Sequence, residues 1–195
     1  MGLGFRKTAT AMAVVLMLSG QAGYALAADP APKSYEQTIS RLVRQDGLLP
    51  IFVDQDGGRV LVQLPAAQAD GVMARVIHHT ALRTGVGSAV TGLDRAQIGA
   101  TNILAFRRIG RRILAELENP KYAAPNGSAD EQAAARDAFV GSTVWAGDIV
   151  ATAPDGSVLV DIGGFLTRDA MGIAETLKAT GQGTLRPVAD LTLVD

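Results

Sequence analysis

The segment Thr91–Tyr122, TGLDRAQIGATNILAFRRIGRRILAELENPKY, contains the strongest secondary-structure pattern in the chain. Within Arg111–Glu118 the side chains alternate with a period of two, which is typical of an antiparallel strand that is buried on one face. The residues on the apolar face are Ile113, Ala115 and Leu117. Gly110 separates this run from a second apolar run, Thr101–Arg108. We therefore predict that the two runs form a β-hairpin with its turn at Gly110.

Further hairpins are predicted on both sides of this one. Upstream, Leu48–Val53 and Arg59–Leu64 flank an Asp-Gly turn, which supplies the positive φ angles that a tight hairpin requires. Downstream, Thr143–Ala153 and Val158–Ile162 flank the turn sequence Pro-Asp-Gly-Ser. Val72–Leu82 fits a helix or a strand, and its β-branched residues favour a strand. The loop TGVGSAVTG follows it.

Three segments carry helix signals. A helix is predicted to begin at Ser34, with Gln37 three residues on as in a capping box, and to end at Gly47. Ala129–Val140 has acidic residues in its first turn, where the helix dipole favours them. Asp169–Thr180 is predicted to be N-capped by Thr167 or Asp169 and stopped by Gly181. The predicted fold class is α+β, a hairpin-rich antiparallel sheet with two or three flanking helices.

The first 27 residues have the features of a signal peptide. Two basic residues precede a short apolar run, AMAVVLML, and Ala25-Leu26-Ala27 fits a signal peptidase site. Cleavage after Ala28 and an uncleaved N-terminal anchor are the alternatives. The expected organisation is a signal peptide at 1–27, a linker and N-terminal helix at 28–46, and a single α+β domain at 47–195. We expect an exported protein, periplasmic or extracellular.

Composition excludes several classes of protein. The chain has no cysteine, so thiolate nucleophiles and cysteine-ligated zinc are excluded. Residues 28–195 hold 16 basic and 19 acidic residues, a net charge of −3, which argues against a nucleic-acid binder. No segment after the signal peptide is long and apolar enough to predict a membrane span.

No complete catalytic motif is present. His78 and His79 are adjacent, and neither a strand nor a helix easily brings neighbouring side chains to one metal ion. There is no H-E-x-x-H and no G-x-S-x-G motif. The candidate acids are Asp94, Asp148, Asp161 and Asp169. Structural roles suffice for Asp161, which is expected to end a strand, and for Asp169, which is expected to open a helix. Asp94 and Arg95 are expected to pin the glycine-rich loop through an ion pair or hydrogen bonds.

Four stretches in order resemble a known family. They are GLLPIFVDQDGGRVLVQLP, GVGSAVTGLDRAQIG, ILAFRRIGRRILAELENPKYAA and DAFVGSTVWAGDIVATAPDGSVLVDIGGFLTRDAMGIAETLK. This order resembles the N-terminal domain, itself of unknown function, of large exported bacterial zinc-dependent metallopeptidases of metzincin-like type. The resemblance covers about Gly47 to Arg186. In that family a later region carries the H-E-x-x-H zinc site, for which this chain has no counterpart.

The chain also departs from the family pattern. Members usually have Gly where this chain has Ala96, and an Arg that is missing after Tyr122. They tend to have a Thr near Asp161, where this chain reads Asp161-Ile162-Gly163. Because no residue here matches the zinc site, the resemblance carries no catalytic, cofactor-binding or metal-binding residue over to this chain.

The resemblance implies a non-catalytic accessory domain of, or a truncated relative of, such a peptidase. The chain is then not an enzyme, zinc belongs only to a separate catalytic domain, and that domain is the expected partner, in cis or in trans. The alternative is a stand-alone periplasmic binding or interaction module, and a hydrolase using Asp94 or His78 is a weaker idea. The residues expected to form a structural motif are Leu93, Asp94, Arg95, Gln97, Gly99, Trp145, Asp161, Arg168 and Asp169.

Overall fold

The structure is a computed structural model that describes residues 34–85, 87, 90–122, 124–139, 141–188, 191, 192 and 194. The expected signal peptide, residues 1–27, and the Pro-rich linker lie outside the described residues. Eight strands form one antiparallel sheet in the order β1-β2-β3-β8-β7-β6-β5-β4. Their bounds are β1 Val43–Gln45, β2 Ile51–Asp54, β3 Arg59–Leu64, β4 Val72–Ala81, β5 Ile98–Ile109, β6 Arg112–Glu118, β7 Ser142–Thr152 and β8 Val158–Asp161.

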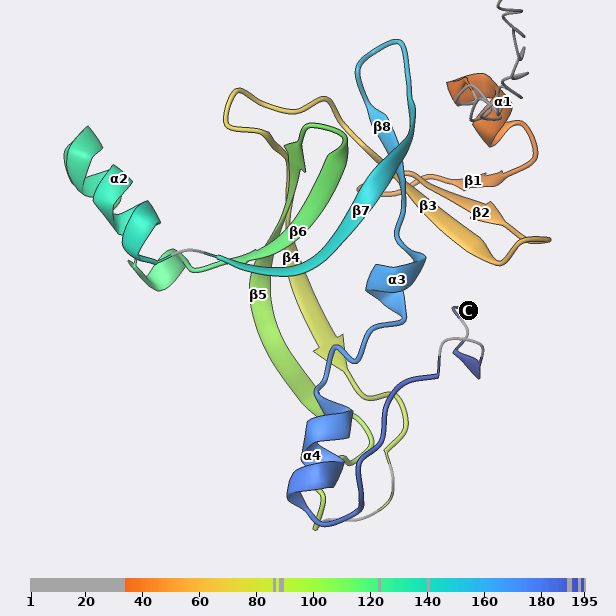
Figure 1. Cartoon of the computed structure of the whole chain (residues 1–195), viewed down its shortest axis with the longest axis vertical. Coiled ribbons are helices and arrows are strands. Elements are labelled where there is room, and N and C mark those ends of the chain that lie inside the picture. The colour runs from red at the N-terminus through yellow and green to blue at the C-terminus, as the bar shows by residue number, and fades with distance from the viewer. Residues whose placement is uncertain are drawn as a thin grey trace, which may run out of the picture. The chain divides into compact units, whose positions relative to one another are not determined.

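The helices in the described residues are short and flank the sheet. They are α1 Tyr35–Ile39, the 3-10 turn Pro120–Tyr122, α2 Ala129–Ala138, α3 Gly163–Leu166 and α4 Ile173–Ala179. The α+β class is therefore confirmed, although the sheet dominates. Figure 1 shows the curled sheet, with α1 beside its first strands and α4 beyond the far ends of β4 and β5.

The predicted hairpins are present. β5 and β6 pair with Ile109 opposite Arg112, and Gly110 adopts φ 60°, the left-handed region that glycine occupies without strain. β2 pairs with β3, and β7 pairs with β8. The ambiguous segment 72–82 is a strand, and its pairing with β5 places it at one end of the sheet.

The N-terminal helix is shorter than predicted. The capping box at Ser34 and Gln37 is formed, but the helix ends at Ile39 rather than at Gly47. Val43–Gln45 is instead strand β1, which pairs with β2. Helical spacing in this segment was misleading, because hydrogen bonding to a neighbouring strand overrides local propensity over so few residues.

The C-terminal helix also differs from the prediction. It begins at Ile173 rather than Asp169, and the short helix α3 precedes it. Gly172 is the N-cap, in the left-handed region, and provides no side-chain cap. Asp169 nevertheless accepts hydrogen bonds from the amides of Ile173 and Ala174, at 2.8 Å each, so the predicted capping residue acts from outside the helix.

Two apolar clusters hold the sheet. The larger joins strands from both halves of the sheet to α3 through Phe165. Its other buried members are Val62, Leu64, Met73, Leu104, Phe106, Ile113, Ala115, Val158 and Val160. The smaller is built on Phe52, Leu61, Ala151 and Leu159, and Tyr35 and Ile39 of α1 pack against it. Burial on this scale is the main favourable contribution to folding of a cysteine-free chain.

Candidate functional site

Phe165 of α3 is the centre of an aromatic cluster. Its ring meets those of Phe106, Trp145 and His78 edge-on, with centroids 6.3, 6.1 and 5.8 Å away. The guanidinium carbon of Arg168 lies 3.7 Å from the centroid of the same ring. Edge-to-face aromatic pairs and cation–π contacts each add to the stabilisation that area burial gives. The cluster therefore fixes α3, and the segment after it, on the sheet.

The backbone around this cluster is shaped to let Trp145 approach. An added Cβ at Gly147 would lie 2.3 Å from the indole ring, and one at Gly164 would lie 3.4 Å from its Nε1. Asp161 holds the start of α3, because its Oδ1 accepts a hydrogen bond from the Gly163 amide at 2.9 Å. These contacts give Trp145 and Asp161 of the predicted motif structural roles.

Arg168 joins the cluster to β4. It donates a hydrogen bond to the Phe165 carbonyl and lies 3.3 Å from His78 Nε2. Burial lowers the pKa of His78, and the charge of Arg168 and the neighbouring His79 lower it further. Burial also lowers the pKa of Arg168. His78 is therefore a neutral acceptor for the guanidinium near neutral pH.

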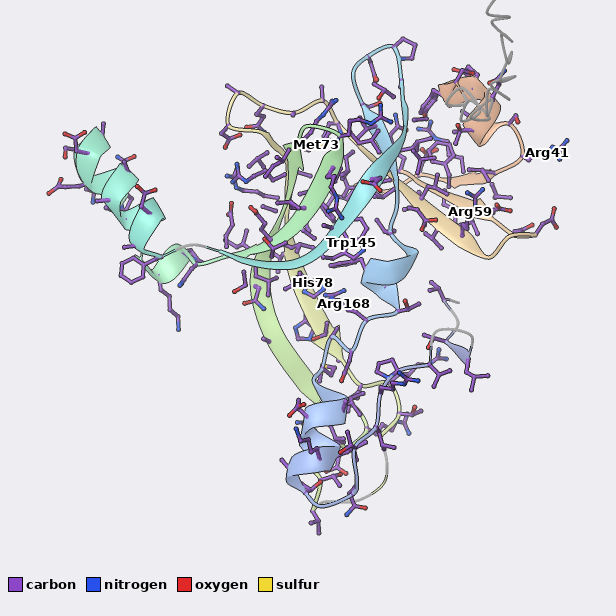
Figure 2. The ribbon with its side chains drawn as sticks, in the orientation of Figure 1. Arg41, Arg59, Met73, His78, Trp145 and Arg168 are labelled. Carbon is purple, nitrogen blue, oxygen red and sulfur yellow. The ribbon has the colours of Figure 1, made fainter. Side chains whose placement is uncertain are left out.

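A cavity of about 590 Å³ lies next to this cluster, between the end of β4, helix α4 and the C-terminal segment. Apolar side chains supply much of its wall: Met171, Ile173, Leu177, Leu185 and Pro187. In the described part of the lining the charged residues are Arg168, Asp169 and Arg186, and His79 lies at the β4 side. Figure 2 shows Arg168 and His78 side by side between the long strands and α3.

Gly99 determines how closely the segment before α4 can approach the sheet. A Cβ there would lie 2.5 Å from Thr80 Oγ1 and 2.6 Å from Met171 Sδ. Thr80 and Met171 both line the cavity. The glycine therefore lets the segment before α4 pack against β4 and β5, and it forms part of the support of the cavity.

The Leu93–Gly99 segment acts as a packed turn. Leu93 is buried, while Asp94 and Arg95 are exposed. A Cβ at Gly85 would lie 2.2 Å from the Leu93 carbonyl oxygen, so the glycine-rich loop rests directly on this turn. The Asp94 amide donates to Gln97 Oε1 at 3.3 Å. Within the described residues no ion pair joins Asp94 to Arg95, and the contact of Gly85 with this turn is made to backbone atoms.

Ala96 is strained in this turn. Its φ is 63°, and it is the one non-glycine residue with a positive φ among the described residues. Two hydrogen bonds to Leu82 hold the backbone of this turn. The Ala96 amide donates to the Leu82 carbonyl, and the Leu82 amide donates to the carbonyl of Gln97.

The structure brings together five of the nine predicted motif residues around the cluster and the cavity. These are Gly99, Trp145, Asp161, Arg168 and Asp169. The other four, Leu93, Asp94, Arg95 and Gln97, form the separate turn. Sequence reasoning missed Phe165, although two glycines, Gly163 and Gly164, directly precede this aromatic residue and allow close packing.

A second, polar cavity of about 710 Å³ lies on other strands. Two ion pairs line it, Arg75 to Glu118 and Arg107 to Glu116, each with a nitrogen–oxygen distance of 2.9 Å. Asp70 also lines it and shares Arg75 at 3.5 Å, so each of these carboxylates already has an arginine partner within the chain. This cavity is therefore a weaker candidate for binding than the first.

Among the described residues no three His, Asp or Glu side chains converge where they could hold a metal ion. No helix in the described part of the chain is long and apolar enough to cross a membrane. Comparison with known proteins finds no matching family model, no matching curated protein and no matching solved structure.

Proposed function

We propose that this chain is a non-catalytic accessory domain of, or a truncated relative of, an exported bacterial zinc-dependent metallopeptidase, and that it acts by binding. The observation that carries the proposal is that the partly buried charged residues of the motif make contacts within the fold. Asp161 and Asp169 accept hydrogen bonds from backbone amides. The Arg168 guanidinium contacts the Phe165 carbonyl and His78 Nε2. These contacts give the three residues structural roles, so their presence in the motif does not require a catalytic one.

The turn at Ala96 supports the family resemblance on which this proposal depends. The resembled family usually has Gly at this position, and φ is 63° here. Only glycine adopts that region without a steric cost, so the backbone suits the family residue better than its own.

The binding surface that we propose is the free edge of β4. This ten-residue strand ends the sheet, and within the described residues no further strand pairs with it. Ile77, near its middle, is 81% exposed. A long sheet edge with an exposed apolar side chain is a template for pairing with another chain. We propose that a peptidase catalytic domain, in cis or in trans, covers this edge.

The first test is zinc content and peptidase activity of the purified exported chain. We expect no bound zinc and no turnover of a casein substrate. Stoichiometric zinc with proteolysis would overturn the non-catalytic assignment and would direct attention to His78 and His79.

The second test maps the partner. A photo-crosslinking amino acid replaces Ile77 on β4, and the matched control replaces the exposed Arg41, which lies next to α1 (Figure 2). We expect the Ile77 variant to cross-link to a protein that contains H-E-x-x-H and the Arg41 variant not to. Equal labelling from both positions, or no peptidase among the products of the Ile77 variant, would contradict the proposed docking edge.

A second candidate function is a stand-alone periplasmic binding module without enzymatic activity. The cavity beside Arg168 favours it, because its volume lies within the ~300–1,000 Å³ typical of small-molecule sites. A soluble monomer that melts cooperatively without any partner would favour this candidate, and aggregation through an exposed apolar edge would favour the first.

A further inference from the structure

We propose that the cavity between β4, α4 and the C-terminal segment binds a small amphipathic carboxylate, a molecule with an apolar chain and one anionic end. The inference goes beyond the proposed function, because it requires no partner protein. It rests on the composition of the cavity wall and on the position of one arginine.

The wall is divided by chemistry. Helix α4 and the segment before it contribute Met171, Ile173 and Leu177, and the C-terminal segment contributes Leu185 and Pro187 from the other side. Such a wall buries an apolar chain, which gains roughly 0.8 kcal/mol for each buried CH₂ group. Leu185 is 54% exposed, so a ligand would cover apolar surface that now contacts water.

The charge of the wall favours an anion. Among the lining residues that the structure describes, Arg168 and Arg186 are cationic and Asp169 is the one carboxylate, so these residues together carry one positive charge. Asp169 directs both oxygens at the amides of Ile173 and Ala174, which offset its charge locally. Arg168 is held by Phe165 and His78.

Arg186 is the residue that selects the anionic end. It is exposed, it lines the cavity, and it makes no ion pair or side-chain hydrogen bond with any described residue. A guanidinium binds a carboxylate through two parallel hydrogen bonds, which gives both affinity and orientation. We therefore place the ligand carboxylate at Arg186 and its chain along Met171 and Leu177.

The two methionines of residues 28–195 offer a site-resolved assay. Met171 lines the cavity, whereas Met73 is buried in the main cluster and serves as an internal control (Figure 2). The full chain is labelled with ¹³C-methyl methionine, and the two signals are assigned with Met171→Leu and Met73→Leu. Decanoate is the probe, and decanol, with the same apolar chain and no charge, is the matched ligand control.

We expect decanoate to shift the Met171 signal in a saturable way and to leave Met73 unchanged. Decanol should bind at least about fivefold more weakly, since a hydrogen-bonded charge pair outweighs a neutral contact. Arg186→Gln should reduce the affinity for decanoate to about that for decanol, whereas Arg41→Gln, at an exposed arginine outside the cavity, should not change it.

A second pair of variants tests the inference independently, in case Arg186→Gln changes the conformation of the C-terminal segment. Leu185→Glu puts a negative charge in the cavity wall and should abolish decanoate binding, while Val188→Glu, exposed on the same segment and outside the lining, should not. The proposal is overturned by the absence of a saturable Met171 shift, by equal shifts of Met73 and Met171, by equal affinities for decanoate and decanol, or by equal effects within either variant pair.

Discussion

At the scale of single residues, Ala96 is the position where the chain departs most clearly from what its backbone requires. Its φ of 63° costs a non-glycine residue roughly 1–2 kcal/mol. Ala96→Gly removes this strain but adds freedom to the unfolded chain, so we expect a net stabilisation of about 0.5–1 kcal/mol. Urea unfolding should show a higher midpoint with an unchanged slope.

The control for this prediction is Ala100→Gly. Ala100 is also exposed, but it lies in strand β5, where glycine weakens the strand. It should lower the midpoint. A stabilisation by both substitutions, or by neither, would show that the backbone at Ala96 is not strained in solution.

His78 should make stability depend on pH below its ordinary pKa of 6.5. Its folded-state pKa lies below the ordinary value of 6.5, because of burial and the charge of Arg168. In the interval between the two pKa values the unfolded chain binds the proton more readily, so stability falls as the pH falls through that interval and is constant above it. The carboxylates with lowered pKa values lose their contribution only below about pH 4–5. They are Asp54, Asp70, Glu131 and Asp155.

The test measures the urea midpoint at intervals over this pH range. His78→Gln should flatten the dependence whatever it does to the overall stability, and His79→Gln should leave most of it in place, because burial is the largest cause of the lowered pKa of His78. A slope that persists in His78→Gln would assign the pH dependence to another group.

At the scale of elements, hairpins could be predicted and short helices could not. The period of two in β6 and the turn at Gly110 before it are local signals that are retained in the folded chain. Helix α1 was predicted too long, because the pairing of Val43–Gln45 with β2 is a non-local interaction. The four-residue α3 has no amphipathic period to read, and what holds it is the burial of Phe165 against distant strands.

The same reasoning applies to the candidate site. Asp161, Arg168 and Asp169 could be selected from sequence, but their tasks depend on which backbone amides and rings approach them. The cavity wall combines β4, α4 and the C-terminal segment, which are widely separated in sequence. No local pattern indicates such a combination.

Helix α4 gives the prediction at this scale. The first two amides of this helix donate hydrogen bonds to the Asp169 carboxylate, and the N-cap Gly172 has no side chain to accept one. Asp169→Ala should therefore cost about 1–2 kcal/mol, mainly as local fraying of α4. Hydrogen exchange should become faster in Ile173–Ala179 and stay unchanged in β2 and β3.

The matched control is Asp94→Ala, which removes an exposed carboxylate to which no described residue donates a hydrogen bond. It should change exchange in neither region. Uniformly faster exchange in Asp169→Ala would mean that Asp169 supports the whole fold rather than α4.

At the scale of the whole molecule, β7 and β8 connect the two halves of the sheet. The first part of β7 pairs with β6, its last part pairs with β8, and β8 pairs with β3. The pairing of Leu61 with Asp161 joins residues far apart in sequence. Such long-range pairing makes folding slow, on the order of milliseconds to seconds. Because β7 and β8 pair with strands of both halves, each half of the sheet depends on the other.

We therefore expect one cooperative transition, which Val160→Ala in β8 should shift as a whole. Val160 is fully buried in the main cluster, so the substitution should cost about 2 kcal/mol. Far-UV circular dichroism and the fluorescence of Trp145, the single tryptophan, should agree with each other on the urea midpoint, both in the unsubstituted protein and in the variant. Val43→Ala, at a half-exposed position on edge strand β1, should cost less than about 0.5 kcal/mol. Separate midpoints for the two probes would mean that the halves of the sheet unfold independently, because Trp145 lies where β7 pairs with β6.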